Sequence, residues 1–515
     1  MHSSPAVYWL KRDFRLADNP ALSAALAAHE RVCVLYVVEE AWLTAPQTSA
    51  FHVHAVTGAL ADLRRRLAHH AGADVLVLRG GARETLERMH DALPFTHLYS
   101  HEEVGVNWTY QRDEVVRAWC RERGVTWTEE RQTGVFRAFG DRDKRHLLWK
   151  KFTLAPLLPV PTNADLARLV RPEVWCALDE RSDAPFTLAD TAYELSEGQR
   201  KHVQPVSETD AEETLRSFLY ERGLGYRGGI SSPLTAFEAG SRLSVHLAWG
   251  TLTGRRAYQA ALARKEELKQ SEAEDAGRWR SSLTAFQSRL HWRDHFIQRL
   301  ETEPQIEFEP LNKAYEALEY KDDPVDYEAW KTGHTGFPLV DACIRCLLGS
   351  GFVNFRMRAM LTSIACHTLH LHWKSLDFPM ARMYTDYEPG IHLSQLQMQA
   401  SVVGINTVRM YSPHKQIIDQ DPEAVFIKEW VPELREFAAK QIQEHRREPL
   451  GDYPGQTVDW WESSRAMRDK IWAIKKLPAT KEEAQRVYDK HGSRRSGPKK
   501  KKTAAKKSDK VTPEK

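Results

Sequence analysis

Val32-Cys-Val-Leu-Tyr-Val-Val38 is the longest apolar run of the chain, and it is too short to cross a bilayer. Its β-branched residues predict a strand. Similar short runs precede residue 150, and helical stretches such as Phe51 to His70 and Tyr110 to Glu122 alternate with them. The other runs are Val7 to Leu10, Val75 to Leu78, Thr96 to Ser100 and Val125 to Thr128. This alternation predicts a doubly wound α/β domain with a parallel sheet over residues 1–150.

The pattern changes twice beyond residue 150. Between about Leu154 and Pro205 the periodicity fades and prolines recur, so we expect a surface connector over residues 151–211. From Glu212 to about Ala479 the pattern is helical with almost no β alternation, which predicts an all-α domain over residues 212–480. A chain of 515 residues is long enough for two such cores.

Charge is concentrated at the C-terminus. The segment from Gly492 to Lys515 carries ten Lys or Arg against Asp509 and Glu514, a net charge of +8, whereas the whole chain has +3. Without an aromatic anchor, residues 481–515 are predicted to be a disordered basic tail. Nonspecific attraction to nucleic-acid phosphate and a merely solubilising role are both compatible with it.

The six cysteines are sparse and irregularly spaced, which favours reduced thiols and an intracellular compartment. No secretory signal peptide is visible after Met1. Cys343-x-x-Cys346 lacks the further ligands that a metal site needs, so we expect no metal there and interpret the pair as helix packing.

The α/β half has neither GxGxxG after its first strand nor a GxxxxGK[ST] loop, so ordinary dinucleotide or P-loop chemistry is not indicated. A sheet of this class can bind a ligand at the carboxyl ends of its strands, but the fold alone does not identify the ligand.

Two segments of the helical half carry chemistry. Ala239-Gly-Ser-Arg-Leu-Ser244 places hydroxyls before an amphipathic run from His246 to Ala261, which suits a phosphate, although a simple helix cap is the alternative. Phe286-Gln-Ser-Arg-Leu-His-Trp-Arg-Asp-His-Phe296 places an aromatic residue and two arginines at helical spacing. The alternative interpretation is an amphipathic core helix with solvated arginines.

A third region is more specific. It contains WKTGHTGFPLVDACIRCLLGSGFVNFRMR from Trp330 and DYEPGIHLSQLQMQASVVGINTVRMYSPHKQIIDQDPEAVFIKEWVPEL from Asp386. In order and separation these blocks resemble the FAD-binding half of photolyases and cryptochromes, and VYWLKRDFRL from Val7 resembles the opening of that family. The resemblance spans roughly Val7 to Leu434. It implies FAD folded in a U shape inside the helical domain.

The resemblance also implies which residues hold FAD. Tyr226 with Ser241, Arg242, Leu243 and Ser244 matches the phosphate-holding positions, although Gly240 stands where Thr is common. The remaining cofactor positions are Phe286, Arg293, Phe355, Arg358, Asp386, Glu388 and His392. Arg358 and Asp386 match an ion pair beside the ring, and a cation there favours the reduced anionic flavin by Coulomb attraction.

His392 matches the residue facing flavin N5, which is Asn in photolyases and Asp in plant cryptochromes. We expect a neutral His that hydrogen-bonds N5, with a titratable His that gates flavin protonation as the alternative. The electron path also departs from the family pattern. Trp373 matches the middle of three tryptophans, but Leu396 replaces the flavin-proximal one, and Tyr384, Tyr387 and Tyr411 are substitute candidates by sequence position.

The resemblance implies a pocket that accepts a flipped pyrimidine pair. Trp292 matches one aromatic wall, Met398 replaces the facing Trp, and Arg289 replaces a thymine-binding carboxylate. Phe355 and Ala359 occupy the positions of the two histidines of (6-4) photolyases, so that subtype is not supported. Without a cysteine after Cys366, the iron-sulfur subtype is not supported either. Arg356 and Arg409 match cationic positions on the DNA-binding face.

These observations favour light-driven repair of pyrimidine dimers, by electron transfer from excited reduced FAD. We expect a monomer that acts on DNA, without a membrane. The alternative is a cryptochrome photoreceptor that signals through flavin redox change. A nonphotochemical nucleotide-binding protein would leave the ordered motifs unexplained. For a second antenna chromophore in the α/β domain the alternatives are methenyltetrahydrofolate, a deazaflavin, a lumazine or none. We expect the protein in the cytoplasm with the nucleoid, or in the nucleus if the source is eukaryotic.

Overall fold

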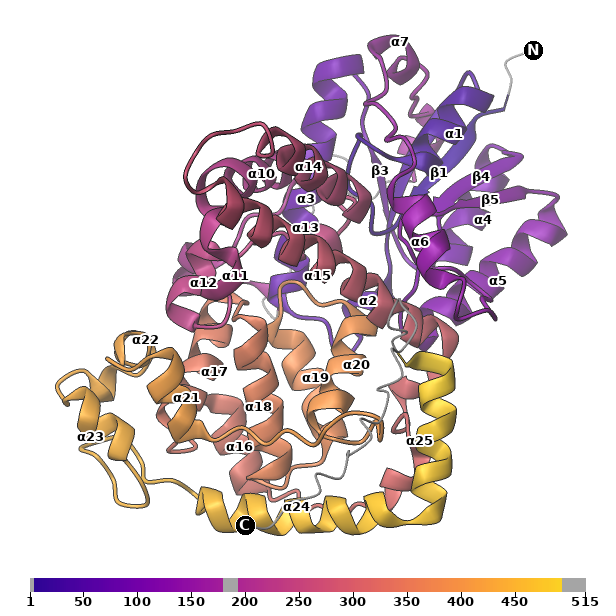
Figure 1. Ribbon diagram of the computed structural model, residues 1–515. Coiled ribbons are helices and arrows are strands. Elements are labelled where there is room, and N and C mark those ends of the chain that lie inside the picture. Colours follow the sequence, from indigo (N-terminus) through magenta and orange to yellow (C-terminus); the bar gives the residue numbers. More distant parts are fainter. Residues whose placement is uncertain (1–3, 179–192, 493–515) are drawn as a thin grey trace, which may run out of the picture.

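The computed structural model describes residues 4–178 and 193–492. Its N-terminal part is a parallel five-stranded sheet with the strand order β3-β2-β1-β4-β5 (Figure 1). The strands are β1 (Ala6–Leu10), β2 (Val32–Val38), β3 (Leu76–Arg79), β4 (His97–His101) and β5 (Thr126–Glu130). Each predicted strand is present, with boundaries that differ by two residues or fewer.

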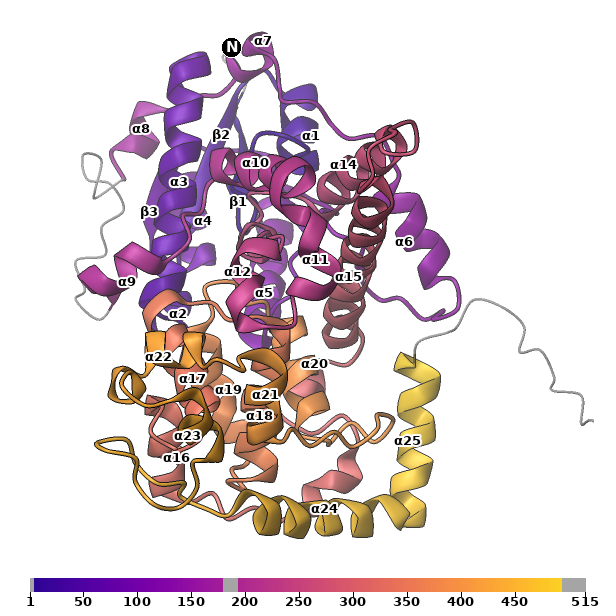
Figure 2. The ribbon, with the colours of Figure 1, turned by 60° about the vertical axis from the view of Figure 1, so that its left-hand side comes forward.

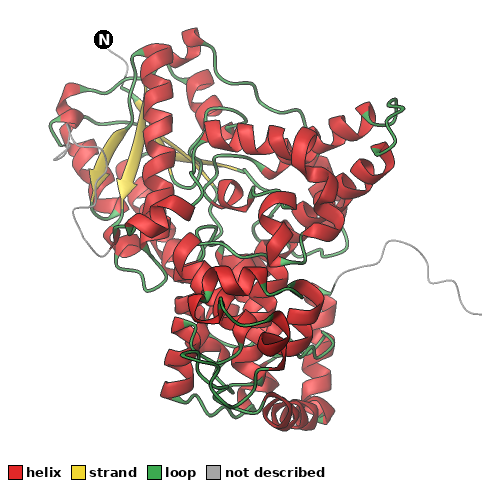
Figure 3. Cartoon of the chain, turned by 90° about the vertical axis from the view of Figure 1, so that its left-hand side faces the viewer, coloured by secondary structure: helices red, strands yellow, loops and turns green. Residues whose placement is uncertain are grey.

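Helices cover both faces of this sheet, as Figure 3 shows. Every residue of β1 and β2 is buried, so alternate side chains supply two cores. Tyr8 packs with α1 (Pro20–Ala28) and α3 (Ala50–Ala71), whereas Trp9 packs with α4 (Ala82–Ala92) and α5 (Asn107–Arg123). The predicted doubly wound α/β fold is confirmed.

The connector contains more structure than its fading periodicity predicts. It crosses the surface through short helices, and Leu169 forms a parallel bridge with Val32. Residues 179–192 of the predicted connector lie outside the described residues. The short helices of this half are α2 (Glu40–Leu43), α6 (Arg145–Thr153), α7 (Asn163–Leu166), α8 (Glu173–Cys176) and α9 (Glu197–His202).

The helical domain is confirmed as well. Its longest element, α15 (Ala276–Thr302), packs against α14 near its start and against α20 farther along (Figures 1 and 2). The other helices are α10 (Glu208–Ser217), α11 (Tyr226–Gly229), α12 (Pro233–Ala239), α13 (Ser244–Ala248), α14 (Gly254–Glu267), α16 (Pro324–Thr332), α17 (Pro338–Ser350), α18 (Phe355–His367), α19 (Trp373–Met383), α20 (Pro389–Gln399), α21 (Pro413–Gln420), α22 (Val425–Trp430), α23 (Ala439–Glu444), α24 (Trp460–Lys476) and α25 (Pro478–His491). A π-helical turn (Phe218–Arg222) and short 3-10 turns (Gly223–Gly225, Pro304–Glu307, Lys313–Ala317, Pro432–Leu434) join them.

One predicted run is wrong. His246 to Ala261 is not a single amphipathic helix, because α13 ends at Ala248 and α14 begins at Gly254. Gly250 lies between them at a φ of +68°, where a Cβ would stand 1.9 Å from the backbone oxygen of Arg12. A glycine is therefore required where the helical domain crosses the end of β1.

The predicted tail begins too early. Residues 481–491 belong to α25, whose Val487 is buried with Leu300 and Ile306. This amphipathic helix turns up from α24 toward the end of α15 (Figure 1). The rest of the predicted tail, residues 493–515, lies outside the described residues.

Buried polar contacts join the two domains. The Asp18 carboxylate accepts from Thr253 Oγ1 at 2.6 Å and from Arg255 Nε at 2.8 Å. Glu208 accepts the backbone N–H groups of Leu16 and Ala17 at 2.7 and 2.9 Å. Both carboxylates are almost fully buried, so the interface depends on their partners.

A search for membrane-spanning helices covers the described ranges. No single helix there is both long and apolar enough, and α17 and α18 qualify only when joined across a bend of 120°. Most residues of both helices are buried in the helical core.

Candidate functional site

The proposed phosphate segment lies between α12 and α13. Arg242 adopts a left-handed backbone with φ of +58°, a conformation that is uncommon outside glycine and often occurs at functional sites. Arg222 Nη2 donates to the carbonyl of Ser241 at 2.7 Å and supports the turn. Leu243 is buried, whereas Ser241 is half-buried and Ser244 is exposed. The turn therefore anchors an apolar residue and leaves two hydroxyls accessible.

Arg242 itself lies against aromatic rings. Its guanidinium is 3.7 Å from the centroid of the Phe352 ring and 5.0 Å from that of Phe237. Burial lowers the pKa of Arg242 to about 10, so it stays charged at neutral pH, and its Nη1 has no hydrogen-bond partner. Arg242 is thus a half-buried cation whose buried Nη1 can still donate a hydrogen bond.

Arg358 and Asp386 form the ion pair that the resemblance implies. Arg358 Nη1 and Nη2 donate to the two carboxylate oxygens at 2.9 and 3.1 Å, and Nε donates to the carbonyl of Val353. Burial alone would raise the pKa of Asp386, but the charge and hydrogen bonds of Arg358 lower it. The bidentate pair fixes the guanidinium plane across the ring of Tyr384, at 4.2 Å.

Arg293 and Glu388 form a second, looser pair. Their Nη2 and Oε2 atoms are 3.5 Å apart, and Arg293 also donates to Asp294 Oδ1 at 3.0 Å. Burial raises the pKa of Glu388 against the opposing charges of Arg12 and Arg293. Because Glu388 Oε1 has no hydrogen-bond partner, this carboxyl can still accept a hydrogen bond.

His392 is held by a buried carboxylate. Its Nε2 lies 3.0 Å from both Asp377 Oδ1 and the Asp377 carbonyl oxygen, and Lys374 Nζ is 3.1 Å from Asp377 Oδ2. Burial would raise the pKa of Asp377, but the hydrogen bond and charge of His392 lower it. One imidazole nitrogen is thus engaged, and only Nδ1 is left for another contact.

Aromatic rings form a string from His392 across the domain interface. Successive ring centroids lie 5.4 Å apart for His392 and Tyr387, 5.6 Å for Tyr387 and His52, 5.8 Å for His52 and Trp249, and 6.4 Å for Trp249 and Trp42. Trp42 is half-buried on α2. The string thus connects the core of the helical domain to the sheet domain.

The other predicted cofactor residues are brought together in part. Tyr226 and Phe286 pack edge to face at 5.9 Å, and burial raises the pKa of Tyr226 to about 12 against the charge of Arg289. Phe355 is 53% exposed at the start of α18. It is therefore a surface aromatic residue rather than a buried cavity wall.

The two residues predicted to form the walls of the lesion pocket, Trp292 and Met398, belong to α15 and α20, which contact each other. Trp292 is half-buried and stacks on Phe296 at 5.7 Å, and Met398 is half-buried. Arg289 and Arg409 are exposed and Arg356 is half-buried. Within residues 4–178 and 193–492, none of these three arginine side chains has an ion-pair or hydrogen-bond partner.

Several sequence candidates are core residues. Trp373 and Leu396 are buried, and Tyr411 packs at the edge of the same core near Trp460. No ring contact joins Trp373 or Tyr411 to His392 among the described residues. Cys343 and Cys346 are buried on α17, and burial raises the pKa of both thiols. Such thiols are unreactive packing groups.

The donor set fits a dinucleotide with a polar ring. Arg242 Nη1, Asn354 Oδ1 and Glu388 Oε1 are buried polar atoms that lack partners in the described chain, and natural structures leave few such atoms. A phosphate would satisfy the cation, and ring N–H or ribose O–H groups would satisfy the acceptors. The site therefore fits FAD.

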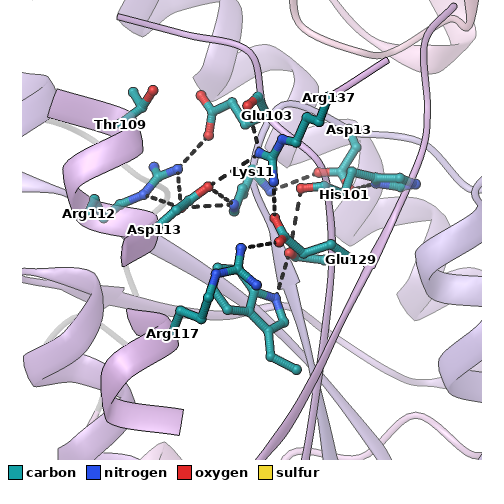
Figure 4. Close-up of polar contacts among 12 residues, drawn as sticks. Lys11, Asp13, His101, Glu103, Thr109, Arg112, Asp113, Arg117, Glu129 and Arg137 are labelled. Carbon is teal, nitrogen blue, oxygen red and sulfur yellow. Dashed lines mark hydrogen bonds and ion pairs between the residues drawn. The ribbon is translucent and has the colours of Figure 1, made fainter. Parts of the chain in front are cut away.

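Sequence reasoning missed a second cluster, at the carboxyl edge of the sheet (Figure 4). Arg112 binds Glu39, Glu103 and Asp113 at 2.6 to 2.8 Å, and Lys11 binds Asp113 at 3.0 Å. The charges of the carboxylates raise the pKa of Arg112 against its burial. Charged residues within two positions of the ends of three strands, Lys11, Glu39 and Glu103, could have predicted it, because parallel strands end at one edge.

This cluster borders a cavity of about 90 Å³ between the two domains. The cavity is lined by aromatic residues as well as charges, including Trp9, Trp42, Trp108 and Trp249. A smaller cavity of about 50 Å³, bordered by Arg12, Arg293 and Glu388, also lies between the two domains. Arg12 lines both.

Comparison with known families gives two matches. Residues 6–144 match the family model described as DNA photolyase, and residues 286–473 match the model of the FAD binding domain of DNA photolyase.

Known proteins resemble the chain over most of its length. A deoxyribodipyrimidine photo-lyase of Halobacterium salinarum is 29% identical, covering 88% of this chain and 96% of its own. A cryptochrome DASH of Gloeobacter violaceus is 25% identical, covering 90% and 95%. A class III photolyase from Agrobacterium tumefaciens superposes with a TM-score of 0.78 at 21% identity, covering 93% and 99%. An archaeal photolyase from Sulfolobus tokodaii with two FAD molecules has a TM-score of 0.73 at 23% identity, covering 91% and 100%.

Proposed function

Because the chain belongs to the photolyase/cryptochrome family, we propose that it repairs pyrimidine dimers in DNA under blue light. When bound, FAD supplies an electron from its light-excited reduced state to the dimer. The relative in Halobacterium salinarum is named a deoxyribodipyrimidine photo-lyase, which supports the same reaction here.

One observation carries the choice of DNA as substrate. The resemblance assigns Arg289, Arg356 and Arg409 to DNA binding, and none of them has a carboxylate partner among the described residues, unlike arginines such as Arg255 and Arg358. Unpaired guanidinium groups at a pocket rim are suited to the phosphates of a DNA backbone. Trp292 and Met398 would then contact the flipped pyrimidines.

The chain's own residues would prepare the cofactor. Arg358, fixed by Asp386, would place a positive charge beside the ring and so favour its reduced anion. Asp377 would hold His392 so that only Nδ1 can exchange a hydrogen bond with the ring. The segment Ser241–Ser244 would hold the phosphates through hydroxyl groups and backbone N–H groups.

The test is dimer repair. Purified, photoreduced protein is incubated with DNA containing cyclobutane dimers under blue light and in darkness, and the remaining dimers are counted. Loss of dimers only in the light is the expected result. Unchanged dimer counts in a protein that binds and photoreduces FAD would contradict the proposal.

A cryptochrome-type photoreceptor is the second candidate. It is favoured by Leu396 and Met398, which replace tryptophans of the family pattern, and by the similarity to a cryptochrome DASH. Such a protein would change flavin redox state in light without consuming dimers.

A second chromophore is proposed for the cavity at the sheet edge. Its tryptophans would stack on a planar ring, and Lys11 and Arg112 would bind acidic substituents. The Sulfolobus tokodaii structure contains two FAD molecules, which shows that the fold accommodates a second chromophore. Absorbance of the extract released by denaturation would identify the ligand.

We further propose that the protein is a monomer. We also propose that it is located with the DNA, at the nucleoid in a prokaryote or in the nucleus of a eukaryote. The domain limits proposed are residues 1–150, 151–211 and a helical domain from 212 that includes α25. Light scattering of the purified protein would test the monomer.

A further inference from the structure

A cationic cluster without an acceptor lies where α6 meets α15. Figures 1 and 2 both draw these helices side by side, near the end of α25. The Trp149 ring of α6 packs on His291 of α15 at 4.7 Å, and Trp149 Nε1 donates to Asp294 at 2.8 Å. His291, His295 and Arg299 occupy one face of α15 because they are spaced by four residues.

Two guanidinium groups of this cluster are buried and unsatisfied. Arg145 is 1% exposed and Arg299 is 4% exposed. Nε and Nη2 of Arg145, and Nε and Nη1 of Arg299, have no hydrogen-bond partner. Burial lowers the pKa of each to about 10, so both remain charged at neutral pH. A buried charge without an acceptor is strongly unfavourable.

Neutral imidazoles lie near these arginines: His295 near both, and His291 near Arg145. Burial lowers the pKa of His291 to about 4, and burial with the charges of Arg299, Arg145 and Arg142 lowers that of His295 to about 2. Arg142 Nη2 donates to His295 Nδ1 at 3.1 Å, which leaves His295 Nε2–H as a further donor. His291 Nε2 is also buried without a partner.

The neighbouring carboxylates are already engaged. Asp294 accepts from Trp149, from the backbone N–H of Gly134 and from Arg293. Glu303 binds His491, Arg486 and Lys490. Neither carboxylate is hydrogen-bonded to Arg145 or Arg299.

We propose that Arg145, His291, His295 and Arg299 form a binding site for a phosphate group. The unpartnered nitrogens come from two helices and are more numerous than the two oxygens of a carboxylate. A phosphate supplies at least three when it is free or terminal. The site is separate from the proposed flavin-holding residues and does not depend on the proposed repair activity.

The test uses the full chain in phosphate-free buffer. Its melting temperature is measured against inorganic phosphate, with chloride at matched ionic strength as the reference. We expect a saturable rise in the wild type. Arg299→Gln and Arg145→Gln should weaken the apparent Kd by about tenfold to a hundredfold, because each removes a charge-assisted contact.

Arg280→Gln is the matched control, since Arg280 is an exposed arginine on the same helix. It should keep the wild-type response. Without phosphate, Arg299→Gln should melt no lower than the wild type, because it removes a buried charge. No saturable response in the wild type, or an equal response in all variants, would overturn the proposal.

A second arm identifies the source of the phosphate. Affinity for undamaged duplex DNA is compared between wild type and Arg299→Gln without inorganic phosphate. Weaker DNA binding by the variant, together with the phosphate response, supports a site for a backbone phosphate. Equal DNA binding with the phosphate response supports a site for free phosphate or a small phosphate ester.

Discussion

Arg358 shows how one side chain combines structure and chemistry. Its three nitrogen donors are all used, two on Asp386 and one on the carbonyl of Val353. That arrangement leaves the charge fixed beside the proposed ring position. The pairing itself could be predicted from the resemblance, whereas the backbone contact could not.

Arg358→Ala should lose FAD. Removing one partner of a buried ion pair leaves Asp386 uncompensated, at a cost of about 3 to 5 kcal/mol. The ratio of flavin to protein absorbance after purification should fall to a small fraction of the wild-type ratio. Arg356→Ala, two residues away and without an ion pair in the described chain, should purify with the wild-type ratio. A fully yellow Arg358→Ala protein would refute the role of the pair.

The salt dependence of DNA binding tests the rim arginines. Each phosphate contact contributes roughly one unit to the slope of log K against log salt. Arg409→Gln and Arg356→Gln should therefore each reduce that slope by about one, with similar effects on all sequences. Fluorescence anisotropy of labelled duplexes at several salt concentrations measures it. An unchanged slope in both variants would place the DNA elsewhere.

The limits of sequence reasoning at this scale have a physical cause. The positions of Ser241 to Ser244, Arg358 and Asp386 follow from motifs that are local in sequence. The partners of His392 and Arg242 do not, because Asp377 and Phe352 are brought in by packing. The unpaired donors of Arg145 and Arg299 are visible only when burial is known.

At the scale of elements, α15 and α20 can pack closely because Gly390 of α20 has no side chain at their contact. A Cβ on Gly390 would stand 2.6 Å from Cα of Ile297. Gly390→Ala should therefore push α20, which carries His392, away from α15, and destabilise the protein by about 1 to 3 kcal/mol. Urea unfolding measures the change. Gly254→Ala meets no atom within 4 Å and should be close to neutral. Equal effects of the two variants would contradict the packing argument.

The aromatic string makes a prediction about reduction of the flavin. Trp373 and Leu396 do not continue a tryptophan path, whereas Tyr387 contacts His392 and leads through His52 to Trp249. Tyr387→Phe and Trp249→Phe should slow photoreduction by an external thiol, because phenylalanine is much harder to oxidise. Flavin absorbance under blue light measures the rate. Tyr411→Phe is the control, and slowing by that variant alone would contradict the route.

Helix α25 should respond to acid. The contacts of Glu303 with His491, Lys490 and Arg486 outweigh burial and lower the pKa of Glu303 from 4.5 to about 2. A lowered carboxyl pKa contributes stability above about pH 4.5, and that stability is lost as the pH falls toward 2. After allowance for solvent, the contribution is about 2 kcal/mol or less.

Urea unfolding at pH 6, 4 and 3 tests this contribution. Glu303→Gln should be less stable than the wild type at pH 6, and the difference should shrink as the pH falls. Glu482→Gln, which changes an exposed carboxyl of α25 itself, should show no such trend. If the stability difference between Glu303→Gln and the wild type does not vary with pH, the effect comes from packing and not from the charge of Glu303.

At the scale of the whole molecule, most of the architecture could be predicted. The five strands of the sheet domain follow from short β-rich runs, of which those of β1 and β2 are buried on both faces. The long helices of this domain follow from the helical stretches between these runs. The break at Gly250 and the helix after Lys481 could not be predicted in this way. The break depends on the backbone of Arg12, which belongs to the other domain and passes close to Gly250. The helix depends on burial of Val487 in a core that includes Leu300.

The buried carboxylates at the domain interface have a consequence for the evolution of the sequence. Asp18 belongs to one half and finds its partners, Thr253 and Arg255, in the other, while Glu208 caps backbone groups of Leu16 and Ala17. Neither half can be exchanged freely between relatives, because a chimera that replaces one half would leave a buried carboxylate without its partners. The sequences of the two halves are therefore expected to evolve together, so that a substitution on one side of the domain interface is matched by a substitution on the other side.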